Sequence, residues 1–177
     1  MEQKSHQRWA KIGARHTQAV ERFFAAANGI EAAGWNEPVS VGEWTPAQAT
    51  WHLILTYDIL TRELRTGTGL RIETGWLQRQ FLRLMALPII MLTRRLPSGA
   101  PAAADILPGD VSFEREQELT RLRQSITEFE AELQARREVA GQQLTHHLFG
   151  TVAAIHGLDF MAVHTDHHAR QISRQYR

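Results

Sequence analysis

The sequence predicts an all-α fold, and two observations support that class. Apolar residues recur at steps of three and four along several long segments, which is the period of one face of an α-helix. No segment alternates apolar and polar residues over a length typical of a strand. A chain of 177 residues suits one hydrophobic core, so we predict that residues 1–177 form a single helical bundle domain.

The first two predicted helices are separated by a loop rich in Gly and Pro. Residues 5–28 carry an apolar stripe with charged residues on the opposite face. The second helix has a strong start signal, because Thr45 can cap it, Pro46 suits the first helical position and Gln48 completes a capping box. This helix is predicted to run to about residue 65, with His52 on its inner face.

The third predicted helix, residues 75–96, contains the most apolar run of the chain. Pro88 should kink or split it, because proline removes a backbone donor and clashes with the preceding turn. The run at 81–96 is shorter than the roughly 20 residues that span a bilayer, and it contains three arginines. We therefore expect a buried helix in this region and no membrane partner.

Two further helices complete the predicted bundle. A long connection rich in Pro, Ala and Gly, residues 97–110, can cross over one end of it. The next helix starts near residue 112 and has a narrow apolar seam, which can face the protein's own core or form a homodimer. A short loop at 146–151 precedes the last helix, predicted at 152–175.

Composition excludes several classes of function. The chain has no Cys, which rules out disulfides, thiolate metal ligands and a Cys nucleophile. Its formal net charge is +1, so no strong attraction to nucleic acid is expected. The N-terminus lacks the apolar core of a signal peptide, and we expect a cytoplasmic protein.

Histidines at helical spacing are the strongest functional signal. His164 and His168 are four residues apart on the last predicted helix, so their side chains share one face and can bind one metal ion. A tight site needs a third ligand. His52 is the best candidate, because bundle cofactor sites are built from inward side chains of facing helices. The spacing also allows His167 to take the place of His168.

Three imidazoles define the chemistry of such a site more than the identity of its metal. A zinc site with three protein ligands keeps its fourth position for water or substrate, which is the catalytic arrangement. Neutral imidazoles leave the ion strongly Lewis acidic, so that a bound water or thiol is activated. Nickel, copper and iron also accept three imidazoles, and spacing alone does not choose among them.

Other residues near this cluster have two interpretations each. Trp44 and Trp51 flank His52 in sequence and can wall a substrate pocket or pack in the core. His147 can line the mouth of the site or be a solvated loop residue. Arg170 can hold an anionic substrate or be an exposed arginine near the chain end. Carboxylates often orient metal-bound imidazoles, and the candidates for this role are Asp58, Glu63 and Asp159.

Two blocks of sequence resemble the DinB-like (YfiT-like) superfamily of metal-dependent enzymes. Residues 147–151 and 164–172, a loop with His, an aromatic residue and Gly followed by a helix with His-x-x-x-His and Arg-Gln-Ile, are similar to its C-terminal signature. Residues 44–53, with Trp-Thr-Pro before a helix in which His is followed by Leu, resemble its first motif. One departure is Leu148, where the family often has Pro after the loop His.

The resemblance implies a four-helix up-down-down-up bundle with a long crossover. It also implies a divalent metal, often zinc or nickel, held by His52, His164 and His168. Characterised members are thiol-dependent transferases or isomerases that use low-molecular-weight thiols such as bacillithiol, mycothiol or glutathione, and members commonly form homodimers. We therefore expect a thiol-dependent S-transferase acting on a small molecule. The alternatives are a metal-dependent hydrolase and a non-catalytic, stress-related metal-binding protein.

Overall fold

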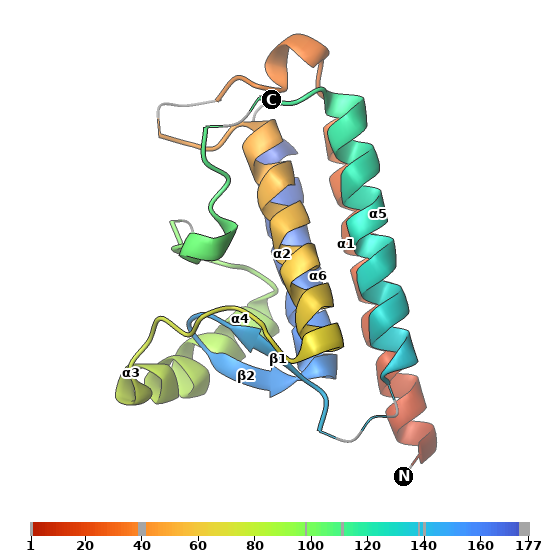
Figure 1. Ribbon diagram of the computed structural model, residues 1–177, viewed down its shortest axis with the longest axis vertical. Coiled ribbons are helices and arrows are strands. Elements are labelled where there is room, and N and C mark those ends of the chain that lie inside the picture. The colour runs from red at the N-terminus through yellow and green to blue at the C-terminus, as the bar shows by residue number, and fades with distance from the viewer. Residues whose placement is uncertain are drawn as a thin grey trace.

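Four long helices form the body of the molecule in a computed structural model (Figure 1). The structure describes residues 2–38, 42–97, 99–110, 112–137, 139 and 141–173. Helix α1 (Glu2–Asn28) runs up, α2 (Pro46–Thr66) and α5 (Arg115–Ala135) run down, and α6 (Ala154–Ser173) runs up. Within the bundle α1 packs against α6, and α2 packs against α5. The up-down-down-up bundle is confirmed.

The predicted capping box starts α2. The hydroxyl of Thr45 accepts a hydrogen bond from the Gln48 backbone N–H, and the Gln48 side chain accepts one from the Thr45 backbone N–H. Two otherwise unpaired backbone donors are thereby satisfied. Pro46 occupies the first turn and Gly67 ends the helix in the left-handed conformation, with φ of 76°. This fixed start determines which α2 residues face α6.

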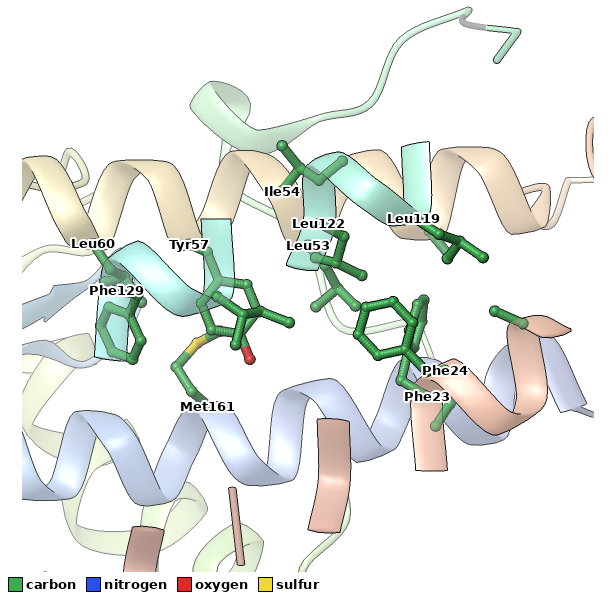
Figure 2. Packing of buried hydrophobic residues seen from close by; sticks show 14 of the residues in the cluster. Phe23, Phe24, Leu53, Ile54, Tyr57, Leu60, Leu119, Leu122, Phe129 and Met161 are labelled. Atoms are coloured by element: carbon green, nitrogen blue, oxygen red, sulfur yellow. The ribbon is translucent and has the colours of Figure 1, made fainter. Parts of the chain in front are cut away.

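The core lies between the four bundle helices (Figure 2). Phe23 of α1, Tyr57 of α2 and Phe129 of α5 are fully buried there, and Met161 of α6 closes the layer. The apolar seam of the fourth predicted helix faces this core, since its side chains are buried within α5. That seam is therefore used inside the protein and is not available for a homodimer.

The crossover from α2 to α5 carries the third predicted helix as three helical pieces. These are α3 (Trp76–Phe81), a π-helical turn η2 (Leu82–Ala86) and α4 (Leu87–Thr93). The Leu87 N–H donates to the Leu82 carbonyl five residues back, and Pro88 follows in the first turn of α4. The π turn thus accommodates a residue that has no N–H to donate, and the helix is divided just before Pro88.

The prediction that this apolar segment is buried is wrong. Leu77 of α3 is 75% exposed and Leu92 of α4 is 86% exposed. Only Ile90 is buried in these three pieces, where it joins a small cluster with Phe149 and Val163. No helix in the described part of the chain is both long and apolar enough to cross a bilayer.

A short β-hairpin stands where the sequence predicted a loop and the start of the last helix. Strand β1 (Gln143–His146) pairs antiparallel with β2 (Gly150–Ala153), with Leu144 opposite Val152. The expectation of no strands is therefore wrong, and α6 begins at Ala154 rather than at residue 152. The predicted end at residue 175 lies outside the described residues. Two 3-10 turns, η1 (Ala32–Gly34) and η3 (Ala104–Ile106), complete the secondary structure described.

Candidate metal centre

Three histidine rings from α2 and α6 converge beside the bundle core. The Nε2 atom of His164 lies 3.1 Å from the Nε2 atom of His52 and 3.1 Å from that of His168. One nitrogen from each ring falls within 4.8 Å of the other two. Tetrahedral ligands about 2.0–2.1 Å from zinc are roughly 3.3 Å apart. The spacing of these nitrogens therefore fits three ligands of one ion.

Hydrogen bonds at the far side of two rings fix which nitrogen carries the proton. The Nδ1 atom of His52 donates to the Ile106 carbonyl at 2.7 Å, and Nδ1 of His168 donates to Oε1 of Gln171 at 2.7 Å. In a neutral imidazole the other nitrogen then presents a lone pair. Both Nε2 atoms are thus acceptors that face the same point. Proteins commonly orient metal-binding imidazoles in this way, through a hydrogen bond from the other ring nitrogen.

The third ring has no such constraint. The Nδ1 atom of His164 is buried and lacks a hydrogen-bond partner within the described residues. Its Nε2 atom can donate a proton to only one of the two converging acceptors at a time. A cation at the centre of the three Nε2 atoms would satisfy all of them together. The donor set therefore fits a divalent metal ion that accepts nitrogen ligands.

Burial keeps these imidazoles neutral, as metal ligands must be. Burial lowers the pKa of His52 to about 4, although the hydrogen bond to Ile106 opposes the shift. The pKa values of His164 and His168 also lie well below the usual range, first because of burial and then because neighbouring histidines repel a second positive charge. The rings are thus free of competing protons at neutral pH.

A cavity of about 1140 Å³ adjoins the three rings. Its walls come from α2, the hairpin, α6 and the crossover that follows α4, and η2 and α4 cover it. We call the segment of α3, η2 and α4, residues 76–93, the roof. The lining is largely aliphatic and aromatic, as in most small-molecule sites. Three arginines also reach it, namely Arg83, Arg95 and Arg170.

The hairpin and α6 hold the roof in place. At its start, the Glu73 N–H donates to the His147 carbonyl at 3.0 Å, and the Thr74 hydroxyl donates to the Leu148 carbonyl at 2.9 Å. At its end, Arg94 forms an ion pair with Asp159 of α6 at 2.6 Å. The same hairpin and helix that line the cavity therefore set the position of its cover.

Three of the four predicted pocket residues lie on the cavity. Trp44 stacks on His168, with ring centroids 6.0 Å apart and planes 11° apart, and it also contacts His52. His147 is a buried cavity residue rather than a solvated one, and its Nε2 donates to the Pro101 carbonyl. Arg170 lines the cavity while paired with Asp166 of the same helix.

The remaining pocket candidate lies elsewhere. Trp51 is absent from the cavity lining and packs in a tilted arrangement on Phe113, with ring centroids 4.8 Å apart. It directly precedes His52 in sequence, but adjacent helical residues point in different directions. Its half-buried ring packs against the bundle core.

The expectation of a carboxylate behind the ligands is wrong. Asp58 forms an ion pair with Arg121, Glu63 accepts hydrogen bonds from Thr145, and Asp159 forms its ion pair with Arg94. A backbone carbonyl and the Gln171 amide take the role instead. The position of Gln171, three residues after His168 on the same helix, was a usable signal for this contact. The sequence contained no signal for the contact of the Ile106 carbonyl with His52, because the crossover between α2 and α5 brings these two residues together.

The fold and these rings define a helical bundle with a three-histidine cluster beside a large cavity. The chain belongs to the DinB superfamily, whose family model matches residues 15–172. It is also similar to TT2238, described as a four-helix bundle protein, at 17% identity. That crystal structure gives a TM-score of 0.60, with 94% of this chain and 98% of that chain covered. No curated protein matches this chain.

Proposed function

We propose that this protein is a metal-dependent enzyme, with His52, His164 and His168 as ligands of a divalent zinc or nickel ion. The observation that carries the proposal is the convergence of three Nε2 atoms at the wall of the cavity. When bound, such an ion supplies Lewis acidity that lowers the pKa of a coordinated thiol or water. A purely structural site would need a closed ligand set and no adjoining space.

The reaction we favour is S-transfer from a low-molecular-weight thiol to an electrophilic small molecule. The cavity volume of about 1140 Å³ exceeds what one small substrate needs, so thiol and acceptor fit together. Glutathione and bacillithiol carry carboxylates, and Arg83 and Arg95, which line the cavity, would bind them. Arg170 would contribute its charge from the same wall while it stays paired with Asp166. The proposal keeps the cytoplasmic location expected from the sequence, where such thiols stay reduced.

The chain's own residues bind and orient the reactants. Aliphatic walls from the roof and hairpin hold the apolar acceptor and exclude water from it. Trp44 covers the face of His168 and keeps that ring in its ligating orientation. In the transfer, a carbon–sulfur bond forms, the acceptor's leaving group departs with its electron pair, and the thiol proton passes to solvent.

The first test is elemental analysis of untagged protein beside a His52→Ala/His168→Ala double variant. We expect nearly one metal ion per chain in the wild type and background levels in the variant. Wild-type protein that contains no metal, and takes up none from added zinc or nickel, would overturn the proposal.

The second test separates transfer from hydrolysis. Metal-loaded protein is incubated with glutathione or bacillithiol and an aryl halide, and with an ester in the absence of thiol. Metal-dependent conjugation that is lost in the double variant supports the transferase, and metal-dependent ester cleavage alone supports the hydrolase. Full metal occupancy with neither reaction supports the non-catalytic alternative.

A further inference from the structure

His146 lines the cavity at the end of strand β1 but is not one of the three converging rings of the proposed metal site. Its ring centroid lies 4.5 Å from that of His147, 4.5 Å from that of Phe149 and 4.7 Å from that of Phe160. These three contacts restrict the orientation of the imidazole. The Phe160 ring also lies 6.2 Å from that of His164, so it contacts both His146 and a proposed metal ligand.

The hydrogen bond at Nδ1 establishes where the proton of the His146 ring lies. The backbone N–H of Leu148 donates to Nδ1 of His146 at 3.1 Å, so this nitrogen carries no proton. A neutral imidazole has a single N–H, which must then be on Nε2. Burial also lowers the pKa of His146 to about 3, which keeps the ring neutral at physiological pH. Nε2 of His146 is therefore a hydrogen-bond donor.

This donor has no acceptor within the part of the chain that the structure describes. An unpartnered ring nitrogen can be buried, as Nδ1 of His147 is, but Nε2 of His146 is not one of the buried unpartnered atoms. Because the His146 ring lines the cavity, we infer that Nε2 is accessible from it. A molecule bound in the cavity can therefore supply the acceptor that the protein lacks.

The surroundings of this donor indicate which kind of acceptor it would meet. The faces of aromatic rings carry partial negative charge, so Phe149 and Phe160 disfavour a carboxylate beside His146 and favour an uncharged, planar group. We propose that His146 binds the electrophilic substrate through a hydrogen bond from Nε2 to a carbonyl oxygen. The substrate class is thus a planar, uncharged carbonyl compound, while the carboxylates of the thiol bind to the arginines.

The role of His146 in the reaction rests on the proposed function, in which a thiol attacks an electrophile. In substitution at the carbon beside a carbonyl group, the thiol sulfur forms the carbon–sulfur bond. A halide leaves with the electron pair of the broken carbon–halogen bond, and the thiol proton passes to solvent. The His146 imidazole keeps its own proton throughout, and its hydrogen bond orients and polarises the carbonyl group.

Binding of two unreactive probes tests the hydrogen bond without any reaction. Acetophenone has a carbonyl group where ethylbenzene has a methylene group, and NMR titration of the full chain, with and without added zinc, measures both affinities. His146→Phe keeps an aromatic ring but removes the N–H. We expect it to lower the ratio of acetophenone to ethylbenzene affinity about 10-fold. An unchanged ratio, or wild-type protein that does not bind acetophenone, would overturn the proposal.

Two other variants control for the shape of the cavity. His146→Gln supplies an amide N–H and should keep the affinity ratio within about threefold of the wild type. His156 also lines the cavity, but its Nε2 atom already lies 3.2 Å from Arg8. His156→Phe should therefore leave the ratio unchanged. If His156→Phe lowers the ratio as much as His146→Phe does, the effect is not specific to His146 and the proposal fails.

NMR of the imidazole nitrogens in the wild type tests the assignment of the proton without a variant. We expect the His146 proton on Nε2, with Nδ1 as the acceptor of the Leu148 N–H. A proton on Nδ1 would leave no donor for a carbonyl oxygen and would contradict the proposal.

Reaction rates distinguish a failure of this proposal from a failure of the proposed function. Metal-loaded protein and glutathione are supplied with phenacyl chloride or benzyl chloride, which differ by a carbonyl group. We expect His146→Phe to lower the ratio of kcat/KM for phenacyl chloride to that for benzyl chloride about 10-fold. Turnover with an unchanged ratio would overturn the role of His146 and leave the proposed function intact. Carbonyl-dependent binding without turnover would support His146 as a binding residue and contradict S-transfer.

Discussion

His16 and the cluster of His52, His164 and His168 are both buried in the bundle, yet they differ in how their ring nitrogens are used. Both nitrogens of His16 have partners, since Nδ1 lies 2.9 Å from Glu130 and Nε2 lies 2.8 Å from the Tyr57 hydroxyl. In the cluster, three Nε2 atoms face one another and share too few protons.

The difference separates a packing histidine from a ligating one. A buried polar group is stable when every donor meets an acceptor, and the chain from Glu130 through His16 and Tyr57 to Thr165 meets that condition. Burial raises the pKa of Tyr57, so its hydroxyl remains a proton donor in this chain. The cluster meets the condition only with a cation present. Convergence of acceptors, rather than burial, therefore identifies these three histidines as the candidate metal site.

The largest expected effect comes from removing one ring of the cluster. Apparent binding free energies of zinc sites are about 10–16 kcal/mol, so loss of one of three ligands should remove about 3–5 kcal/mol. We expect His168→Ala to weaken zinc binding correspondingly in a competition titration with a chromogenic chelator. His16→Ala is the matched control and should bind as the wild type does. Equal loss in both variants would show that the two kinds of buried histidine do not differ in metal binding.

The second largest expected effect is the change with pH in the free energy of unfolding of the metal-free protein. The pKa of His52 is about 4 in the folded state and about 6.5 when unfolded. Between these values the unfolded chain binds the additional proton, so stability falls as pH falls from 6.5 to 4, by about 3 kcal/mol from His52 alone. Urea unfolding in the presence of a chelator measures this slope. His52→Gln should make the profile shallower, with the slope that remains coming from His164 and His168. A flat wild-type profile would contradict the prediction.

Loss of the His16 ring should affect stability without affecting metal. His16→Ala leaves a cavity and removes two hydrogen bonds of the buried chain. We expect a loss of about 2 kcal/mol in the free energy of unfolding. Chemical denaturation measures the loss, and elemental analysis should give unchanged metal content. A variant as stable as the wild type would mean that the hydrogen bonds from Glu130 through His16 to Tyr57 contribute nothing to the free energy of unfolding.

The smallest expected effect is on metal affinity when the hydrogen-bond acceptor of His168, the Gln171 side chain, is removed. Gln171→Leu leaves Nδ1 of His168 without its acceptor. Loss of such a contact costs about 10-fold or more in metal affinity. We expect a roughly 10-fold rise in the zinc dissociation constant with stoichiometry unchanged. Gln171→Glu restores an acceptor and should bind at least as tightly as the wild type. Identical affinities for all three proteins would exclude a role for Gln171.

The bundle was predictable because its signals are local. Helical periodicity, the capping box at Thr45 and the glycine after α2 all act within a few residues. That His164 and His168 share a helix face was predictable for the same reason. His52 was chosen because it lies on the inner face of its helix, and its approach to the other two rings depends on the packing of α2 against α6. The family match over residues 15–172 agrees with the resemblance found in the sequence.

The parts that were missed depend on distant contacts. Strand β1 has only four residues, and a contact with a distant helix stabilises it: the Thr145 N–H donates to Glu63 of α2 at 2.9 Å. Glu63 also occupies the space beside Gly69, where an added Cβ would lie 2.3 Å from its carboxyl carbon. The exposure of the roof was not predicted. An apolar helical segment indicates that its side chains favour burial, but the sequence does not show which surface, if any within the chain, buries them.

The roof has a different relation to the fold from the helices that carry the proposed ligands. His52 and His168 lie on helices whose neighbours form the main core, whereas α3 and α4 contribute no residue to that cluster. Substitutions in the roof can therefore reshape the cavity while the bundle continues to fold. In the enzyme we propose, new substrate preferences would evolve most readily through substitutions in this segment, and directed evolution of the protein should begin there.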